Sequence, residues 1–327
     1  MKYKYLTLVL CLFSIIDARA QLTDTVAHFS LQEAIEYAQR NQSSIQNAKI
    51  DEQIAANTVK QTIGIGLPQV NGSVNFQDFL KVPTNLVPGE IFGQPGKLLP
   101  VQFGVKYQSS FGLELNQLLF DGTYLVGLQA SKTYRELSSK SLKRSRIETS
   151  VAVTKAYYSV LVSNEQLNLL DANMVRLKKS LDDTKAHYKN GFVEKIDVDR
   201  LTVLNNNLET ERENVVRLLE LNVNLLKFQM GMSIQSKLTL KDSIAGLQVV
   251  QSFAVSDTSA YKNRIEYSLL ETQKKLNELD LKRYKSQFLP SLSAFGSTSQ
   301  NALSNSFGSL FDRSFPTTVI GFRLAVP

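Results

Sequence analysis

Helix-breaking residues are almost absent from the middle of this chain, and this absence constrains its fold more than any other feature. Between Gly127 and Gly231 the sequence contains no proline and a single glycine, Gly191. Before Gly191, residues of one helix face recur at alternating steps of three and four, the heptad pattern of helices that pack along their length. These positions are Val153, Ala156, Val160, Ser163, Leu167, Leu170, Met174, Leu177, Leu181, Thr184 and Tyr188. A helix from Gly127 to Gly191 would extend about 95 Å, which is too long to fold back on a compact core.

The same type of spacing resumes after Gly191 with more polar members. The positions are Leu201, Leu204, Leu208, Glu211, Val215, Leu218, Asn222 and Leu225. Two such arms around one glycine predict an antiparallel helical hairpin over residues 121–232, with its tip at 189–199. Glycine adopts the left-handed backbone conformation at little cost, so Gly191 is the expected end of the first arm.

Two segments before the hairpin alternate between apolar and polar residues, as half-buried strands do. They run from Gln69 to Asp78 and from Lys106 to Gln117. Each is about ten residues long, the length at which a tilted strand crosses a bilayer. Four of the eight prolines lie between them, which predicts a long loop over residues 81–100. An antiparallel sheet on a soluble core would show the same alternation, so the two strands alone leave both interpretations open.

The N-terminus has the composition of a secretory signal peptide. A basic start precedes the apolar run from Leu6 to Ile16, and an Ala-Arg-Ala site ends at Ala20. The run is too short to span a bilayer as a helix. We therefore expect residues 1–20 to be removed and the mature chain to be exported. The one cysteine, Cys11, lies inside this segment, so the mature chain has no disulfide framework.

Charge pattern and reactive residues argue against several classes of function. The formal net charge is +7, but basic and acidic residues are mixed along the helical region, which is typical of a solvated helix face rather than a nucleic-acid patch. The two histidines, His28 and His187, are far apart, and we find no metal-ligand spacing, phosphate loop or nucleophile elbow. The sequence predicts no enzyme, no metal and no cofactor. After residue 20, no segment is apolar for long enough to form a membrane helix.

The last part of the chain repeats the first. Residues 258–289 predict a helix without Gly or Pro, and a polar strand follows Pro290. A shift of 222 positions aligns Leu67-Pro68 with Leu289-Pro290, and a shift of 209 aligns residues 111–118 with 320–327. This indicates an internal duplication whose second copy stops where its hairpin is due. The predicted organisation is a signal peptide (1–20), N-terminal helices (21–66), a first β-hairpin (67–120), the helical hairpin (121–232), a linker (233–257), a helix (258–289) and a second β-hairpin (290–327).

The order of these motifs resembles the TolC-like outer-membrane efflux proteins, and the resemblance covers essentially the whole mature chain. The segments that carry it are "FSLQEAIEYAQRNQSSIQNAKID" (29–51), the Leu-Pro units before the strands, "LLFDG" (118–122) and "YKNGFVEKIDVDRL" (188–201). The resemblance implies a mainly α fold with membrane β-strands. It implies a homotrimer in which each protomer gives four strands to a twelve-stranded outer-membrane barrel and long helices to a periplasmic tunnel. The implied partners are a periplasmic adaptor, an inner-membrane pump and outer-membrane lipid, without nucleic acid.

On this interpretation the chain has three functional surfaces. Substrates would pass through a duct, and the pump rather than the duct would select them. The expected lipid-facing strand residues are Val70, Val74, Phe76, Phe111, Leu113, Leu115, Ile320, Phe322 and Leu324. The expected lumen-facing residues are Gln69, Asn71, Ser73, Asn75, Lys106, Glu114, Asn116 and Arg323. The expected adaptor-docking tip is Gly191, Phe192, Val193, Glu194, Lys195, Ile196 and Asp197. The alternative for the tip is that these residues only hold the turn closed.

One departure from the family pattern limits these assignments. Pro327 aligns with Leu118, so the second helical hairpin is not represented, and we assign no gate residue, because the family's gate draws on that hairpin. Two alternatives to an outer-membrane duct remain open. The first is a periplasmic adaptor or coiled-coil scaffold, which would also be exported and carry a long hairpin. The second is a truncated, non-functional fragment of an efflux channel.

Overall fold

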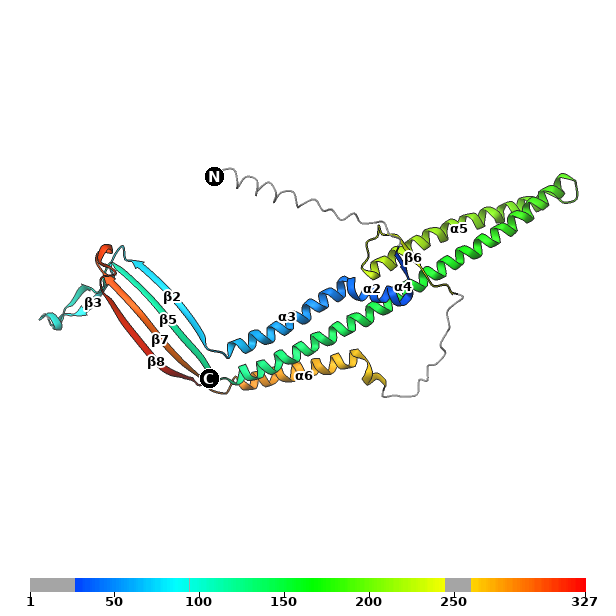
Figure 1. The fold of residues 1–327 in the computed structure, drawn as a ribbon. Helices are drawn as coiled ribbons and strands as arrows, with labels where there is room; N and C mark the ends of the chain where they lie inside the picture. The colour runs from blue at the N-terminus through cyan, green and yellow to red at the C-terminus, as the bar shows by residue number, and fades with distance from the viewer. Residues whose placement is uncertain (1–26, 94, 245–259) are drawn as a thin grey trace, which may run out of the picture. The chain divides into compact units, whose positions relative to one another are not determined.

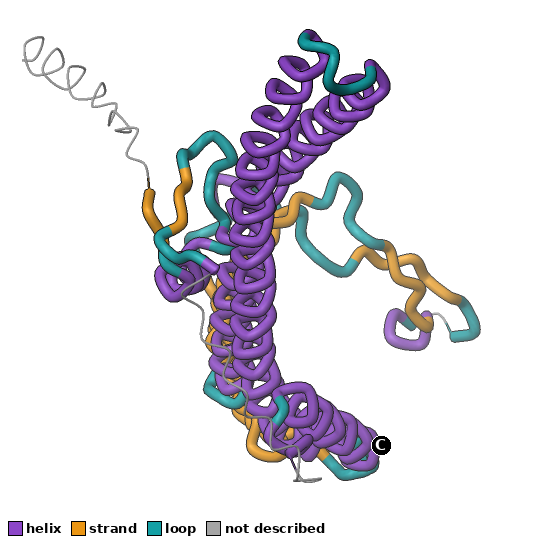
Figure 2. The backbone as a smooth tube through the Cα atoms, turned by 90° about the vertical axis from the view of Figure 1, so that its right-hand side faces the viewer, coloured by secondary structure: helices purple, strands orange, loops and turns teal. Residues whose placement is uncertain are grey.

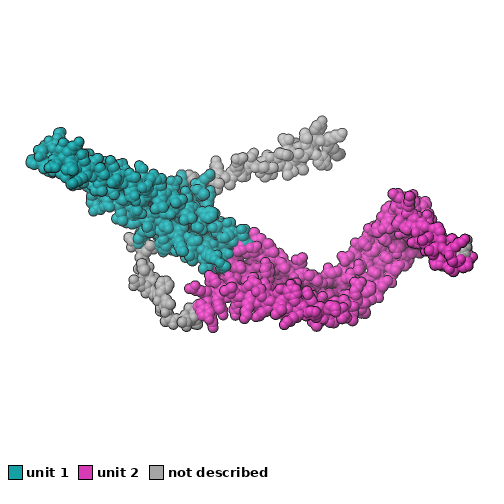
Figure 3. Space-filling view, turned by 180° about the vertical axis from the view of Figure 1, so that it is seen from behind, with its two compact units in different colours: residues 1–47, 144–256 teal, residues 48–143, 257–327 magenta. Residues whose placement is uncertain are grey.

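A computed structural model describes residues 27–93, 95–244 and 260–327. The chain divides into two compact units (Figure 3). Unit 1 contains residues 1–47 and 144–256, and unit 2 contains residues 48–143 and 257–327. The predicted signal peptide lies outside the described residues, as does part of the predicted linker.

Five helices and eight strands follow one another along the described chain (Figure 1). The helices are α2 (Leu31–Asn41), α3 (Ser43–Ile65), α4 (Gly122–Lys189), α5 (Lys195–Met230) and α6 (Ile265–Ser286). The strands are β1 (Ala27–Phe29), β2 (Gln69–Asp78), β3 (Thr84–Pro88), β4 (Leu98–Gln102), β5 (Tyr107–Phe120), β6 (Leu238–Leu240), β7 (Ser291–Ser304) and β8 (Ser314–Ala325). Long helices joined to amphipathic strands confirm the predicted fold class.

The helical hairpin consists of α4, with 68 residues, and α5, with 36. In Figures 1 and 2 the two arms lie side by side up to a short turn. The heptad positions predicted on the first arm are buried or half-buried from Val153 to Thr184. Tyr188, the last of them, is 45% exposed, because it lies beside the turn where packing ends.

The predicted heptad register of the second arm is wrong at every other position. Four of the expected residues, Leu204, Glu211, Leu218 and Leu225, point to solvent. The residues that face the first arm are instead Asn205, Arg212, Leu219 and Leu226, each one position later. Polar contacts between the arms set this register. Arg212 Nε donates to Asp171 Oδ1 at 2.5 Å, and Asn222 Nδ2 donates to Ser163 Oγ at 2.8 Å.

Unit 1 also contains short elements that pack against the hairpin near the end of α5. Strand β1 pairs with β6 in parallel, and α2 packs against α5. Ser30 caps α2, because its hydroxyl accepts from the Glu33 amide while the Glu33 carboxylate accepts from the Ser30 amide. The core is formed by small and large apolar residues of α2, α4 and α5, namely Ala34, Ala38, Val153, Ala156, Tyr157, Val160, Leu161, Leu226 and Met230.

Unit 2 contains an antiparallel four-stranded sheet in the order β2-β5-β7-β8. Helix α3 leads into β2, β5 leads into α4, and α6 leads into β7 (Figure 1). The pairing between β5 and β7 shifts register between Leu118 and Phe120, which is a bulge at the helix end of the sheet. Strands β2 and β8 are the two edges of this sheet in the described chain.

The segment predicted as a loop, residues 81–100, is more regular than its proline and glycine content indicates. It contains β3, a 3₁₀ turn over Gly89–Phe92 and most of β4, and the two strands pair in an antiparallel hairpin. Pro88 and Pro100 both lie within these strands. A two-stranded hairpin has only edge strands, where a missing amide donor is tolerated.

Candidate functional site

The register of the sheet sorts its side chains onto two faces. Directly opposed residues of an antiparallel pair share a face. Val70 lies opposite Leu115, Leu115 opposite Gly296, and Gly296 opposite Ile320. By this register the nine residues predicted to face lipid all lie on one face, across β2, β5 and β8. We call it the apolar face.

Large side chains of the apolar face are uncovered in the single chain. Val74 is 77% exposed, Ile320 83% and Phe322 73%. Contiguous apolar surface of this kind is rare on soluble monomers and marks contact with a membrane or a partner. At the end of this face away from the helices, the rings of Phe76, Tyr107 and Phe307 pack together with centroids 5.7–6.4 Å apart.

The opposite face of the sheet, which we call the polar face, carries the other predicted set. By register it contains Gln69, Asn71, Ser73, Asn75, Glu114, Asn116 and Arg323. Lys106 differs from them, because it precedes β5 and its ammonium lies 4.9 Å from the ring centroid of Tyr107.

Sequence reasoning did not assign Phe295, an aromatic residue that the register places on the polar face. Its ring covers Gly321, where an added Cβ would lie 2.8 Å from the ring. The guanidinium carbon of Arg323 lies 5.3 Å from the centroid of the same ring, which is cation–π geometry. The strand alternation could have placed Phe295, since it has the same parity as Ser293 and Ser297.

The joint between sheet and helices is built from close contacts in unit 2. Asp121 caps α4 by accepting from the Tyr124 amide at 2.9 Å and from the Thr123 hydroxyl. Gln117 Nε2 donates to the Gly66 carbonyl at 2.9 Å. An added Cβ at Gly66 would overlap the Tyr124 hydroxyl, so a larger residue there would have to displace the Tyr124 ring.

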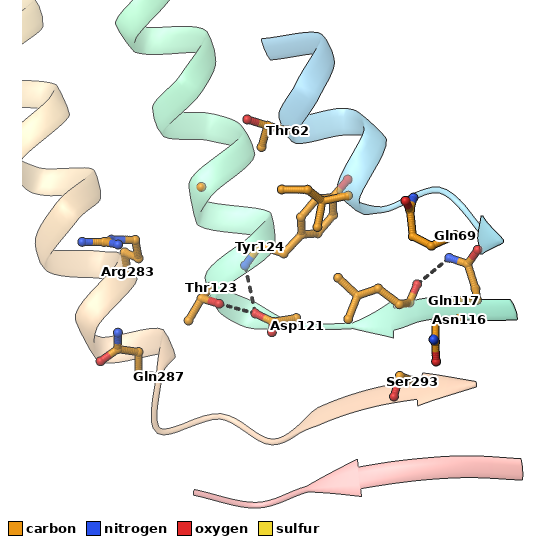
Figure 4. A pocket seen from close by; sticks show the side chains of 13 residues that line it. Thr62, Gln69, Asn116, Gln117, Asp121, Thr123, Tyr124, Arg283, Gln287 and Ser293 are labelled. Carbon is orange, nitrogen blue, oxygen red and sulfur yellow. Dashed lines mark hydrogen bonds between the residues drawn. The ribbon is translucent and has the colours of Figure 1, made fainter. Parts of the chain in front are cut away.

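An open pocket of about 760 Å³ lies at this joint (Figure 4). It is lined by the ends of α3 and α6, the start of α4, the starts of β2 and β7 and the end of β5. Its polar lining comes from all three helices and includes Thr62, Asp121 and Arg283. Arg283 also pairs with Asp280 at 2.8 Å, so its charge is already partly satisfied.

The hairpin tip ends α4 with a Schellman motif at Gly191, whose φ is +79°. The Phe192 amide donates to the His187 carbonyl at 2.9 Å, and the Gly191 amide to the Tyr188 carbonyl at 3.0 Å. The Phe192 ring meets the His187 ring edge-on at 6.2 Å, yet Phe192 remains 77% exposed.

The return arm starts at once after this turn. Glu194 is the residue before α5, Lys195 and Ile196 are its first residues, and the Asp197 amide donates to the Glu194 carbonyl at 3.1 Å. Ile196 is 51% exposed, whereas Val193 is half-buried. The tip therefore offers two exposed apolar side chains, Phe192 and Ile196, between charged ones.

Polar contacts anchor β1 and β6 at the base of the hairpin. The buried Tyr157 hydroxyl donates to Asp242 Oδ2 at 2.8 Å, and burial together with this carboxylate raises the pKa of Tyr157. Lys241 Nζ contacts Glu33 Oε1 at 2.8 Å, and this contact, with the Ser30 amide, lowers the pKa of Glu33 to about 2. These groups hold β1, β6 and α2 together at the base of the hairpin.

Two negative findings concern the part of the chain that the structure describes. Its His, Cys, Asp and Glu side chains form no group of three or more that could hold a metal ion. None of its helices combines the length and the apolar character needed to cross a membrane.

An amphipathic four-stranded sheet that continues into a long helical hairpin is the architecture of the TolC-like outer-membrane channels. The chain belongs to the outer membrane efflux protein family, which matches residues 34–218. A comparison with curated proteins gave no match.

Solved structures of several membrane proteins share this fold. The Campylobacter jejuni CmeC outer-membrane channel is 16% identical, with a TM-score of 0.68 over 91% of this chain and 61% of its own. A membrane protein from Pseudomonas aeruginosa is 17% identical, with a TM-score of 0.73 over 93% and 66%. The Vibrio cholerae outer-membrane protein VceC is 15% identical, with a TM-score of 0.69 over 91% and 68%. The chain thus spans about two thirds of the length of these proteins.

Proposed function

We propose that this chain is the outer-membrane channel component of a tripartite efflux or type I secretion system. It acts as a passive duct for small molecules or proteins, and it has no enzymatic role. Residues 67–120 and 290–327 form its share of a barrel in the outer membrane, and residues 121–232 extend into the periplasm. The observation that carries this proposal is the sheet with one uncovered apolar face and one polar face.

The open edges of the sheet support a homotrimer. Unpaired backbone groups at β2 and β8 cannot remain without partners in lipid, because hydrocarbon offers no hydrogen bonds. Strands β2 and β8 run antiparallel to each other in the order β2-β5-β7-β8, so the β8 edge of one copy can pair with the β2 edge of the next. Three copies of four strands then close a barrel of twelve, with the apolar faces outward.

Membrane extraction and mass measurement test this function directly. We expect the mature chain to resist release from membranes by high salt, to require detergent, and to have the mass of three chains in detergent. Release by salt alone would favour the adaptor or scaffold alternative. A monodisperse monomer in buffer without detergent would refute the channel.

We further propose that the tip contacts a periplasmic adaptor through Phe192, Val193 and Ile196, with Glu194, Lys195 and Asp197 setting the register. The exposure of Phe192 supports this role, because a residue that only closes the turn would bury its ring. A photoreactive residue at position 193 should crosslink an adaptor in the cell envelope.

The double charge reversal Glu194→Lys/Lys195→Glu should reduce that crosslinking at unchanged trimer yield. The matched control is Lys178→Glu/Asp182→Lys, which reverses an exposed pair on the body of α4. Unchanged crosslinking in the tip variant would mean that these side chains serve the turn alone.

A further inference from the structure

Charges are scarce on the polar face. Among its described positions in β2, β5, β7 and β8, Glu114 and Arg323 are the only charged side chains. Glu114 lies opposite Ser297, and Arg323 lies opposite Ser293. The two levels are therefore four residues apart along β7, which is about 13 Å. The Arg323 level is nearer to the helices, since β7 begins at Ser291 directly after α6.

The structure holds Arg323 in place on this face. Its guanidinium stacks on the ring of Phe295, and that ring in turn occupies the space over Gly321. The ring needs the glycine, because any Cβ there would come within 2.8 Å of it. The charge is thus presented on an apolar support beside Ser293, while the side chain remains exposed.

Glu114 is held separately. Asn116 Nδ2 donates to Glu114 Oε1 at 2.9 Å, and Glu114 is exposed. Within the described chain neither Glu114 nor Arg323 belongs to an ion pair. Their separation exceeds the Debye length of about 8–10 Å at 0.1–0.15 M salt, so the potential of one does not cancel that of the other.

We propose that the polar face has two levels of opposite charge: an anion-attracting site at Arg323 and Phe295, and a cation-attracting site at Glu114. The anion-attracting site suits small anionic solutes. Their carboxylate or phosphate would contact the Arg323 guanidinium while an apolar part lies against the Phe295 ring. This inference rests on the proposed function, in which a closed pore repeats each level three times. A permeating solute from the helix side meets the Arg323 level first.

Charged thiol reagents measure the potential at each level. Ser293→Cys reports on the Arg323 level and Ser297→Cys on the Glu114 level, each in a Cys11→Ser background without any other thiol. The full chain is reconstituted in phosphatidylcholine vesicles and treated with an anionic or a cationic methanethiosulfonate. The measured quantity is the ratio of the anionic to the cationic reaction rate.

We expect this ratio to be about fivefold higher at position 293 than at 297 in low salt, and the difference to fade at 1 M salt. Arg323→Gln should lower the ratio at 293 and leave 297 unchanged, whereas Glu114→Gln should do the reverse. Arg323→Lys should keep most of the effect because it keeps the charge. Two results would overturn the inference. The first is an equal ratio of anionic to cationic reaction rate at positions 293 and 297 in the chain with no other substitution. The second is a ratio at position 293 that Arg323→Gln leaves unchanged.

A third cysteine separates this outcome from failure of the channel itself. Val74→Cys lies on the apolar face and should be unreactive in vesicles, since lipid excludes both reagents. If position 74 reacts as fast as position 293, the sheet is not embedded in lipid, and the proposed function fails. If position 74 is protected but the ratios are equal, only the two-level inference fails.

Discussion

Replacing Gly231 with alanine should loosen the base of the helical hairpin. Gly231 ends α5 with a φ of 70°, and the amide after it, that of Met232, donates to the Lys227 carbonyl at 2.8 Å. An added Cβ would lie 2.7 Å from the carbonyl oxygen of Asn41 and 2.9 Å from Cα of Gln42. Both are backbone atoms at the joint between α2 and α3, so neither can rotate away.

Two costs combine at this position. The left-handed conformation costs alanine about 1–2 kcal/mol, and displacing a packed backbone adds roughly 1–3 kcal/mol. Gly191→Ala supplies a matched control. Its φ of +79° carries the first cost, but an added Cβ there meets nothing within 4 Å, so the second cost is absent. We therefore expect a loss of about 2–5 kcal/mol for Gly231→Ala and about 1–2 kcal/mol for Gly191→Ala.

Thermal loss of the helical circular dichroism signal in detergent measures both variants. At about 2–4 °C per kcal/mol, the midpoint should fall by roughly 4–20 °C for Gly231→Ala and by roughly 2–8 °C for Gly191→Ala. An equal shift in the two variants would refute the reasoning, because the close approach to Asn41 would then cost nothing.

Two further outcomes follow from the contacts described above. The carboxylate of Glu33 has a folded pKa of about 2, below its usual value of 4.5, so the stability it contributes is present above pH 4.5 and is lost as the pH falls toward 2. Melting midpoints measured between pH 6 and pH 2.5 should show this loss of stability. A Lys241→Met variant should lose less stability over the same pH range. Gly321→Val should push the Phe295 ring aside and lower the melting midpoint by several degrees. Gly296→Ala, whose Cβ would lie 3.9 Å from its nearest neighbour, should leave the midpoint unchanged. Equal midpoints in the two variants would mean that the position of the Phe295 ring does not require a glycine at 321.

Strand positions were predictable from the sequence because alternation is a short-range signal. The alternation predicts a first strand from Gln69 to Asp78, and β2 has these bounds. The repeat shift of 222 carries Gln69 to Ser291, which is the first residue of β7. The second strand is longer than expected, since β5 continues to Phe120. Its last residues are apolar without alternation, because the bulge after Leu118 ends the regular ladder.

The register of α5 could not be predicted in the same way. Counting leucines favours Leu204, Leu218 and Leu225, and these are exposed. In a hairpin, a polar residue can lie inward when the facing arm offers a partner, as Asp171 does for Arg212. That partner is about 40 residues away in sequence, so no local pattern reveals it. The exposed leucines instead leave an apolar surface on α5 that a single chain does not cover.

The motif "LFDG" at the end of β5 has a physical reason that only the fold supplies. Asp121 caps α4, which requires a short side chain with an acceptor at that position. At Gly122, an added Cβ would lie 2.9 Å from Leu289 Cδ1 and 3.3 Å from the Ser286 carbonyl oxygen. Leu289 belongs to the Leu-Pro unit of the second repeat, so the strand-to-helix joint of one repeat packs on the helix-to-strand joint of the other. The duplication therefore brings the two joints into contact, and this contact fixes how the sheet continues into its helices within unit 2.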